Sequence, residues 1–189
     1  MSDVHPLISR LARLILRLAG WRIAGQLPDL PKFVVVGAPH TSNWDGILLI
    51  IGMLAFERRM HWMGKHTLFW FPFSLLLRVL GGIPVVRGAV GGAVTQMVRI
   101  FEQQERLVLV INPEGTRSKV DRWRTGFYHI AQGAAVPLVL AYADYPQKVV
   151  GIGPTFTPTG DLEADLPQIQ AFFADKVGRH PDRMGLSGA

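Results

Sequence analysis

Strand-like and helix-like segments alternate along most of this chain, and the alternation constrains the fold more than any other feature of the sequence. Residues 32–36 and Leu107–Ile111 are short, apolar and rich in β-branched side chains, which is typical of buried strands. Further strands are predicted at 61–64, 83–86, 136–143 and 149–152, and helices at 44–56, 90–105, 125–132, 166–177 and, after Pro72, within 68–80. This order predicts a single α/β domain with a largely parallel sheet flanked by helices.

The length and composition indicate one folded domain without a conventional membrane-spanning helix. The chain has 189 residues, of which 49% are hydrophobic and 18% charged, and these values exclude an intrinsically disordered chain. The longest apolar run, residues 46–56, would rise about 16 Å as a helix, roughly half of the ~30 Å hydrocarbon core. A protein that lies on the surface of a membrane is compatible with these values.

The charge balance and the absence of cysteine limit the reactions and the partners that are possible for this chain. The sequence contains no Cys, which excludes disulfides, thiolate catalysis and iron–sulfur clusters and fits a cytosolic protein. Lys and Arg total 20 against 14 Asp and Glu, a net charge of +6. Such an excess favours anionic partners, which could be nucleic acid, anionic lipid or a phosphorylated substrate, although it could also serve solubility alone.

The first 26 residues predict an amphipathic helix that is distinct from the remaining domain, residues 27–189. At about 100° per residue, one apolar face is formed by Leu7, Leu11, Leu14, Leu18 and Trp21, and it is widened by Ile8 and Ile15. Arg10, Arg13 and Arg17 border that face, as in helices that lie in a membrane interface. The alternative is a surface helix packed on its own domain, and periodicity does not separate the two.

Several common functional motifs do not occur. The sequence has no GxxxxGK[ST] phosphate loop and no GxSxG nucleophile elbow, and Gly151-Ile152-Gly153 lacks the third glycine of a dinucleotide fingerprint. His61 and His66 are five residues apart, which does not align two zinc ligands on one helix face. No RNA-binding signature occurs either. The sequence therefore contains no motif for a metal site, a nucleotide cofactor or a nucleic-acid partner, and none of the three is predicted from these motifs.

A histidine and an aspartate follow the strand at residues 32–36, in the sequence PHTSNWD. His40 is placed at the carboxyl end of the strand and Asp45 in the first turn of the next helix, so that the two side chains can face each other. Asp45 would then orient the His40 ring, and the free ring nitrogen would take a proton from a hydroxyl group. The alternative is a histidine in a turn beside an aspartate that only caps the helix.

A second polar segment, NPEGTRS, follows the strand Leu107–Ile111. Gly115 permits a tight turn with an exposed amide, while Thr116 and Arg117 offer a hydroxyl and a guanidinium to a phosphate. Glu114 could hold an arginine in place or bind the substrate that accepts the transferred group. Arg87 comes directly after the strand at 83–86. All of these residues follow the carboxyl ends of strands, where open α/β sheets bind ligands.

These motifs, in this order, resemble the glycerophospholipid acyltransferases, a family typified by 1-acylglycerol-3-phosphate acyltransferase. The family's NHxSxxD block is similar to residues 39–45, and its FPEGTRS block is matched at 113–118. Other family segments resemble 64–69 (a lysine-containing segment), 82–87 (G-x-F-x-x-R), 123–126 (F-K-x-G) and 136–138 (V-P-[VI]). The resemblance covers residues 32–145.

The resemblance implies a direct acyl transfer. The counterpart of His40 deprotonates a lysophospholipid hydroxyl, which attacks the thioester of acyl-CoA or acyl carrier protein, with Asp45 orienting the base. The counterparts of Arg87 and of Glu114, Gly115, Thr116 and Arg117 bind the acceptor's phosphate, and the family uses no metal or redox cofactor. It also implies a peripheral protein on the cytoplasmic face of the inner or plasma membrane.

This sequence departs from the family pattern at several positions that leave the acceptor open. Pro39 and Asn112 replace the Asn and Phe that precede the family's two main motifs, and Pro84 and Val86 alter the block before Arg87. The acceptor could therefore be another lysophospholipid or a non-glycerol lipid. Two other interpretations are a lipid-binding protein of this fold without turnover, and a basic nucleic-acid-binding protein in which the motifs are accidental.

Overall fold

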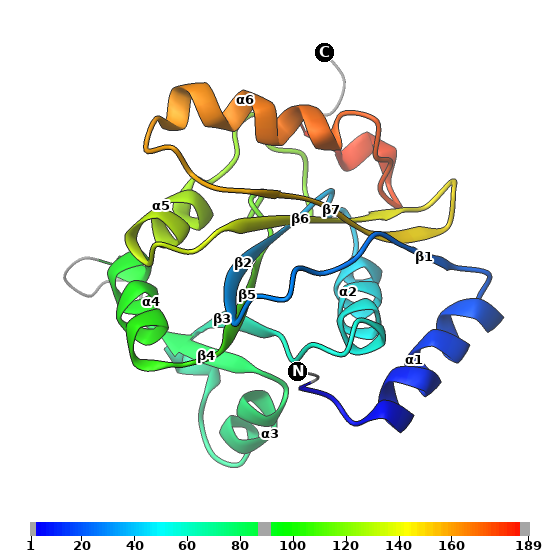
Figure 1. The fold of residues 1–189 in the computed structure, drawn as a ribbon, viewed down its shortest axis with the longest axis horizontal. Coiled ribbons are helices and arrows are strands. Elements are labelled where there is room, and N and C mark those ends of the chain that lie inside the picture. Colours follow the sequence, from blue (N-terminus) through cyan, green and yellow to red (C-terminus); the bar gives the residue numbers. More distant parts are fainter. Residues whose placement is uncertain (1–2, 87–91, 186–189) are drawn as a thin grey trace.

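One seven-stranded sheet organises the molecule, for which a computed structural model describes residues 3–86 and 92–185 (Figure 1). The strand order across the sheet is β1-β7-β6-β2-β5-β3-β4. The strands are β1 (Arg22–Ala24), β2 (Lys32–Gly37), β3 (His61–Lys65), β4 (Gly82–Val85), β5 (Leu107–Ile111), β6 (Leu138–Asp144) and β7 (Val149–Phe156).

The sheet is largely parallel, as the sequence predicts. The neighbours β6, β2, β5, β3 and β4 all run in one direction. β7 is antiparallel to β6, and β1 runs parallel to β7, so these two strands form an edge of opposite direction. The carboxyl ends of β2 and β5, which the sequence motifs follow, therefore meet at the same end of the sheet.

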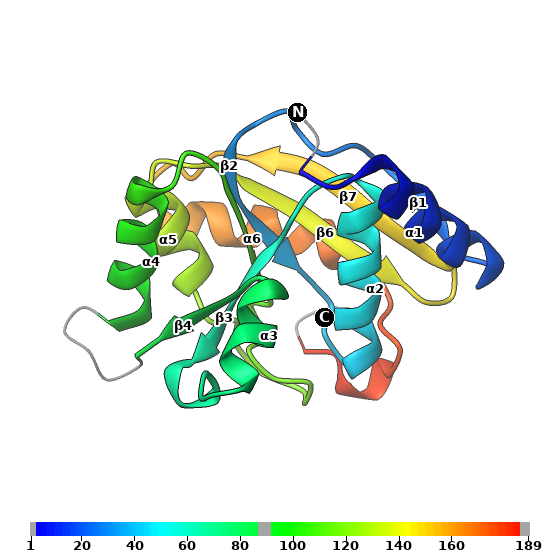
Figure 2. The ribbon, with the colours of Figure 1, turned by 90° about the horizontal axis from the view of Figure 1, so that it is seen from below.

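Helices cover both faces of this sheet. The elements are α1 (Pro6–Leu18), α2 (Asn43–Ala55), η1 (His66–Leu68), α3 (Phe73–Val79), α4 (Gly92–Gln103), α5 (Gly126–Gly133), α6 (Leu162–Phe173) and η2 (Pro181–Arg183). The helices α4, α5 and α6 pack on one face, and α2 packs on the other with α1 outside it (Figures 1 and 2). α3 lies near the β4 edge.

The central strand β2 is buried on both faces, which explains its uninterrupted apolar sequence. Phe33 and Val35 pack toward Met53 of α2, whereas Val34 and Val36 pack toward Phe127 of α5 and its neighbours. All four β2 side chains are fully buried. A strand of this kind has no solvent-facing side, so its side chains do not alternate between apolar and polar.

The amino-terminal segment contributes a strand that the sequence analysis missed. β1 has only three residues and forms by pairing with β7, about 125 residues further along the chain. α1 ends at Leu18 and Gly20 adopts a φ of +78°, a left-handed conformation that suits glycine after a helix. Trp21 is therefore not on the helix, and its ring packs edge-on against Tyr145 with 5.1 Å between centroids.

The last long helix begins earlier than its sequence suggests. The prediction was residues 166–177, whereas α6 extends from Leu162 to Phe173 with Pro167 inside it. The side chain of Asp161 caps the helix by accepting a hydrogen bond from the backbone N–H of Ala164. Packing of Ile169 and Phe173 into the core then outweighs the hydrogen bond that the proline cannot donate.

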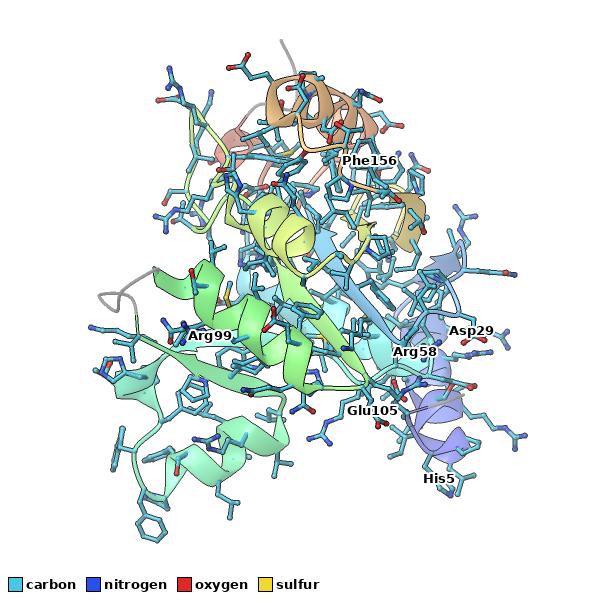
Figure 3. All side chains as sticks on the ribbon, turned by 60° about the vertical axis from the view of Figure 1, so that its left-hand side comes forward. His5, Asp29, Arg58, Arg99, Glu105 and Phe156 are labelled. Atoms are coloured by element: carbon cyan, nitrogen blue, oxygen red, sulfur yellow. The ribbon has the colours of Figure 1, made fainter. Side chains whose placement is uncertain are left out.

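α1 docks through one narrow face and leaves most of its large apolar side chains exposed. Ser9, Ala12 and Leu16 are buried, and the Ser9 Oγ and Arg13 Nε atoms both donate to the Ala55 carbonyl at the end of α2. Just after α2, the buried Arg58 forms ion pairs with Asp3 and with Asp29, which is labelled together with Arg58 in Figure 3. No helix among residues 3–86 and 92–185 is both long and apolar enough to cross a bilayer.

Candidate active site

His40 and Asp45 face each other at the carboxyl end of β2. Their Nδ1 and Oδ2 atoms are 3.6 Å apart, and the two side chains are 14% and 6% exposed. This separation is longer than a good hydrogen bond, but catalytic pairs in unliganded enzymes often shorten when substrate binds. The predicted pair is therefore assembled, with the His40 ring partly exposed and the Asp45 carboxylate buried.

The Asp45 carboxylate is fixed by three further hydrogen bonds. Its Oδ2 atom accepts from the backbone N–H groups of Thr41 at 2.6 Å and Ser42 at 2.7 Å, while its Oδ1 atom accepts from the Tyr145 hydroxyl at 2.7 Å. Ser42 and Asp45 form a reciprocal capping box at the start of α2. Asp45 thus caps the helix and faces His40 at the same time, so the two interpretations that the sequence left open are compatible.

The surroundings of His40 favour its neutral form. Burial lowers the pKa of His40 below its ordinary value of 6.5; the Asp45 carboxylate opposes this shift and the Arg117 guanidinium adds to it. A neutral imidazole has one ring nitrogen that can accept a proton. If Nδ1 donates to Asp45, Nε2 is that acceptor, which is the arrangement a general base requires.

Glu114 holds the backbone of the loop that carries His40. It is 3% exposed, and its two carboxylate oxygens accept from the backbone N–H of His40 at 3.0 and 3.1 Å. Burial raises the pKa of Glu114 to about 7, against the lowering effect of this hydrogen bond. Among the described residues Glu114 has no ion pair with Arg117, so its carboxylate positions His40, and direct contact with substrate stays a prediction.

The segment after Glu114 forms the exposed turn that the sequence predicts. Gly115 has a φ of +65°, and an added Cβ would lie 2.8 Å from the Cδ atom of Arg124, whose side chain crosses the turn. Thr116 and Arg117 are exposed beyond it. Arg87, the other residue predicted to bind phosphate, lies outside the described residues.

The structure adds residues that sequence reasoning did not select. Tyr145 contacts Asp45 from the turn between β6 and β7, a hundred positions away in the chain. Burial, and then the Asp45 carboxylate, raise the pKa of the Tyr145 phenol, which keeps it a hydrogen-bond donor. Arg179 and Arg183 lie near the start of α2 from beyond α6. No motif or spacing in the sequence marks these three residues.

A narrow apolar cavity leads from the pair between α2 and the sheet. Apart from His40 and Asp45, most of its lining is apolar, with side chains that include Leu49, Met53, Phe56, Val150 and Ile152. Its free volume is about 30 Å³, enough for one or two waters. Within the described residues, no group of three His, Asp or Glu side chains is arranged to hold a metal ion.

Comparison with known proteins agrees with this geometry. The acyltransferase family model matches residues 23–142, well over half of the chain, and the chain therefore belongs to this family. A comparison with curated proteins finds no match.

Among solved structures, the chain is similar to the 1-acyl-sn-glycerophosphate (LPA) acyltransferase PlsC from Thermotoga maritima. The two are 19% identical, with a TM-score of 0.63 over 88% of this chain and 75% of that one. This likeness establishes the fold and confirms the predicted α/β architecture.

Proposed function

We propose that the protein transfers a fatty acyl group from an acyl thioester to a hydroxyl group of a lysophospholipid such as 1-acylglycerol-3-phosphate. The observation that carries the proposal is the His40–Asp45 pair, braced by Glu114, at the end of β2. A base without a protein nucleophile suits direct transfer between two bound substrates. The donor is acyl-CoA or acyl carrier protein.

In the proposed reaction, the Nε2 atom of His40 takes the proton of the acceptor hydroxyl as its oxygen attacks the thioester carbonyl. Asp45 holds the ring and stabilises the imidazolium that forms. The tetrahedral intermediate then collapses with cleavage of the carbon–sulfur bond, and His40 returns the proton to the leaving thiolate. An ester and a free thiol result, without change of oxidation state and without a cofactor.

The acceptor's phosphate is assigned to the turn beside the pair. The guanidinium of Arg117, the hydroxyl of Thr116 and the backbone of Gly115 are exposed and lie on the loop that carries Glu114. Arg87 is proposed to complete this site. Guanidinium groups suit this role because their planar donors match phosphate oxygens.

A membrane-facing surface is supported by exposed apolar side chains on α1, on α2 and around α3. On α1, the exposed side chains include Leu7, Leu11, Leu14 and Leu18, the last of which is 79% exposed. Trp44, Ile47 and Ile50 are exposed on α2, which packs against α1, and Trp70, Phe71, Phe73, Leu75 and Leu76 are exposed at and before α3. Large exposed apolar patches are typical of proteins that contact a membrane or a partner.

We propose that this apolar surface rests on an anionic bilayer as a peripheral contact, on the cytoplasmic face of the inner or plasma membrane. Residues 1–26 act as the interfacial element, and residues 27–189 carry the reaction. Arg10 and Arg17 are exposed and free to meet lipid phosphates, whereas Arg13 donates to Ala55 and pairs with Glu57 at 3.6 Å. The docking role therefore falls on Arg10 and Arg17.

The test is turnover of acyl-CoA with a panel of lysolipids, in preparations free of host acyltransferase. His40→Ala should lose at least ~100-fold in rate, the lower end for removal of a general base. Asp45→Asn should lose less, because the base remains. A protein that binds lysolipid but turns over none of the panel would be a lipid-binding member of the family, and near wild-type turnover by His40→Ala would refute the mechanism.

A further inference from the structure

A basic groove lies beside the catalytic pair, between the start of α2 and the segment that follows α6. Its lining comes from residues 41–44, from Arg117, and from Arg179, His180 and Arg183. Its volume of about 320 Å³ falls within the ~300–1,000 Å³ range of small-molecule sites. The proposed function assigns a role to Arg117 but none to the carboxyl-terminal residues.

Several contacts hold the segment after α6 against the loop that carries His40. The backbone N–H of His180 donates to the Oγ1 atom of the fully buried Thr41 at 3.1 Å. Gly178 lies so close to Thr41 that an added Cβ would be 2.9 Å from its Oγ1 and Cγ2 atoms. The carbonyl of Val177 also accepts a hydrogen bond from the Tyr145 N–H at 3.0 Å. These contacts hold the groove in place against the loop that carries His40.

The groove concentrates positive charge without a compensating carboxylate. Arg117, Arg179 and Arg183 form no ion pair within the described part of the chain, and no Asp or Glu lines the groove. The Arg179 guanidinium lies over the Trp44 ring, 5.4 Å from its centroid. Three guanidinium groups in one groove suit a phosphate group, whereas an ammonium group would find no partner there.

The groove lies next to the His40–Asp45 pair. The positive charge of Arg117 contributes to the lowered pKa of His40, and the positive charge of Arg179 opposes the raised pKa of Tyr145, whose hydroxyl donates to Asp45. In a lysophospholipid the hydroxyl is only a few bonds from the phosphate. In an acyl-CoA, the phosphates lie beyond a long pantetheine arm. The position of the groove therefore fits the acceptor better than the donor.

We propose that Arg179 and Arg183 join Arg117 in binding the headgroup phosphate of the acceptor, and that the groove selects anionic headgroups over those that carry an ammonium. The inference rests on the proposed function, whose site it extends by a segment outside the family match at residues 23–142. Arg183 reaches the groove from η2, and Arg179 reaches it from the residues just before η2.

The test compares short-chain, water-soluble acceptors that carry a phosphate monoester, a phosphocholine or no phosphate. Arg183→Gln and Arg179→Gln should each reduce the kcat/KM preference for the phosphate monoester over the unphosphorylated acceptor by about 10- to 150-fold. The matched control is Arg99→Gln, an exposed arginine on α4 on the other face of the sheet, and it should keep the wild-type preference (Figure 3). Because the preference is a ratio of two kcat/KM values of the same variant, any general effect of Arg179 on the catalytic pair cancels.

A second measurement, the affinity for glycerol 3-phosphate by titration calorimetry, does not depend on turnover. Arg183→Gln should weaken this affinity at least about 10-fold. An unchanged preference and affinity would overturn the inference, as would a loss confined to the KM of the acyl donor, or a wild type that prefers the phosphocholine acceptor. A wild type without turnover on any acceptor that still binds glycerol 3-phosphate through Arg183 would refute the proposed function while supporting the groove.

Discussion

Tyr145→Phe tests whether the Asp45 carboxylate must be held in place for His40 to act. The substitution removes only the hydroxyl that donates to Asp45 Oδ1 at 2.7 Å and keeps the ring that packs on Trp21. The backbone N–H groups of Thr41 and Ser42 still hold the other oxygen. The variant therefore loosens the carboxylate without removing it.

The expected loss follows from this geometry. A hydrogen bond to a charged group contributes about 1.5–3 kcal/mol. The lower end applies here, because Tyr145 is half-buried and water can replace its hydroxyl. Since about 1.4 kcal/mol corresponds to a tenfold change in rate, kcat/KM should fall about 10-fold, well short of the ~100-fold or larger loss expected for His40→Ala.

The assay is steady-state acyl transfer, with urea denaturation of the same preparations. The matched control is Tyr128→Phe, because the Tyr128 hydroxyl donates to the buried Asp165 at 2.6 Å on the opposite face of the sheet. This control should unfold at a lower urea concentration yet keep its kcat, whereas Tyr145→Phe should lose kcat. If the two variants lose activity in proportion to their loss of stability, or if Tyr145→Phe is fully active, the positioning role of Tyr145 is wrong.

Three further predictions concern pH and the membrane. Because the pKa of Glu114 is raised from 4.5 to about 7 in the folded state, the protein binds this proton more tightly when folded, and its free energy of unfolding should fall as pH rises through this interval. Glu114→Gln should abolish that part of the slope in urea denaturation at pH 5 and pH 8, and an unchanged slope would contradict the assignment. The kcat/KM of the wild type should fall at acidic pH as His40 becomes protonated, below its ordinary pKa of 6.5. Arg117→Gln should move this fall in kcat/KM to higher pH, because the substitution removes a positive charge that lowers the pKa of His40. A fall at the same pH as in the wild type would show that Arg117 does not act on the pKa of His40. Changing Arg10 and Arg17 together to Glu should weaken binding to anionic vesicles by several kcal/mol, from about 1 kcal/mol per basic residue lost plus the repulsion of the new charges; cosedimentation equal to that of the wild type would show that α1 is not the anchor.

The sequence by itself determined the features that depend on neighbouring residues. The β-branched runs define the central strands, because a strand buried on both faces needs continuous apolar side chains. PHTSNWD places His40 and Asp45 on a strand end and the first helical turn, so their approach is settled within six residues. The glycine in PEGTRS likewise specifies its own left-handed turn.

Only the tertiary structure decided the features that depend on distant segments. The pairing of β1 with β7, the hydrogen bond from Tyr145 to Asp45 and the carboxyl-terminal arginines beside α2 each join residues far apart in the chain. Helical periodicity found an apolar face on α1, but packing decided that Ala12 and Leu16 face inward while Leu11 and Leu14 stay exposed. Local patterns fix which backbone conformation is favourable, whereas the partner of each side chain depends on how the sheet brings separate strands together.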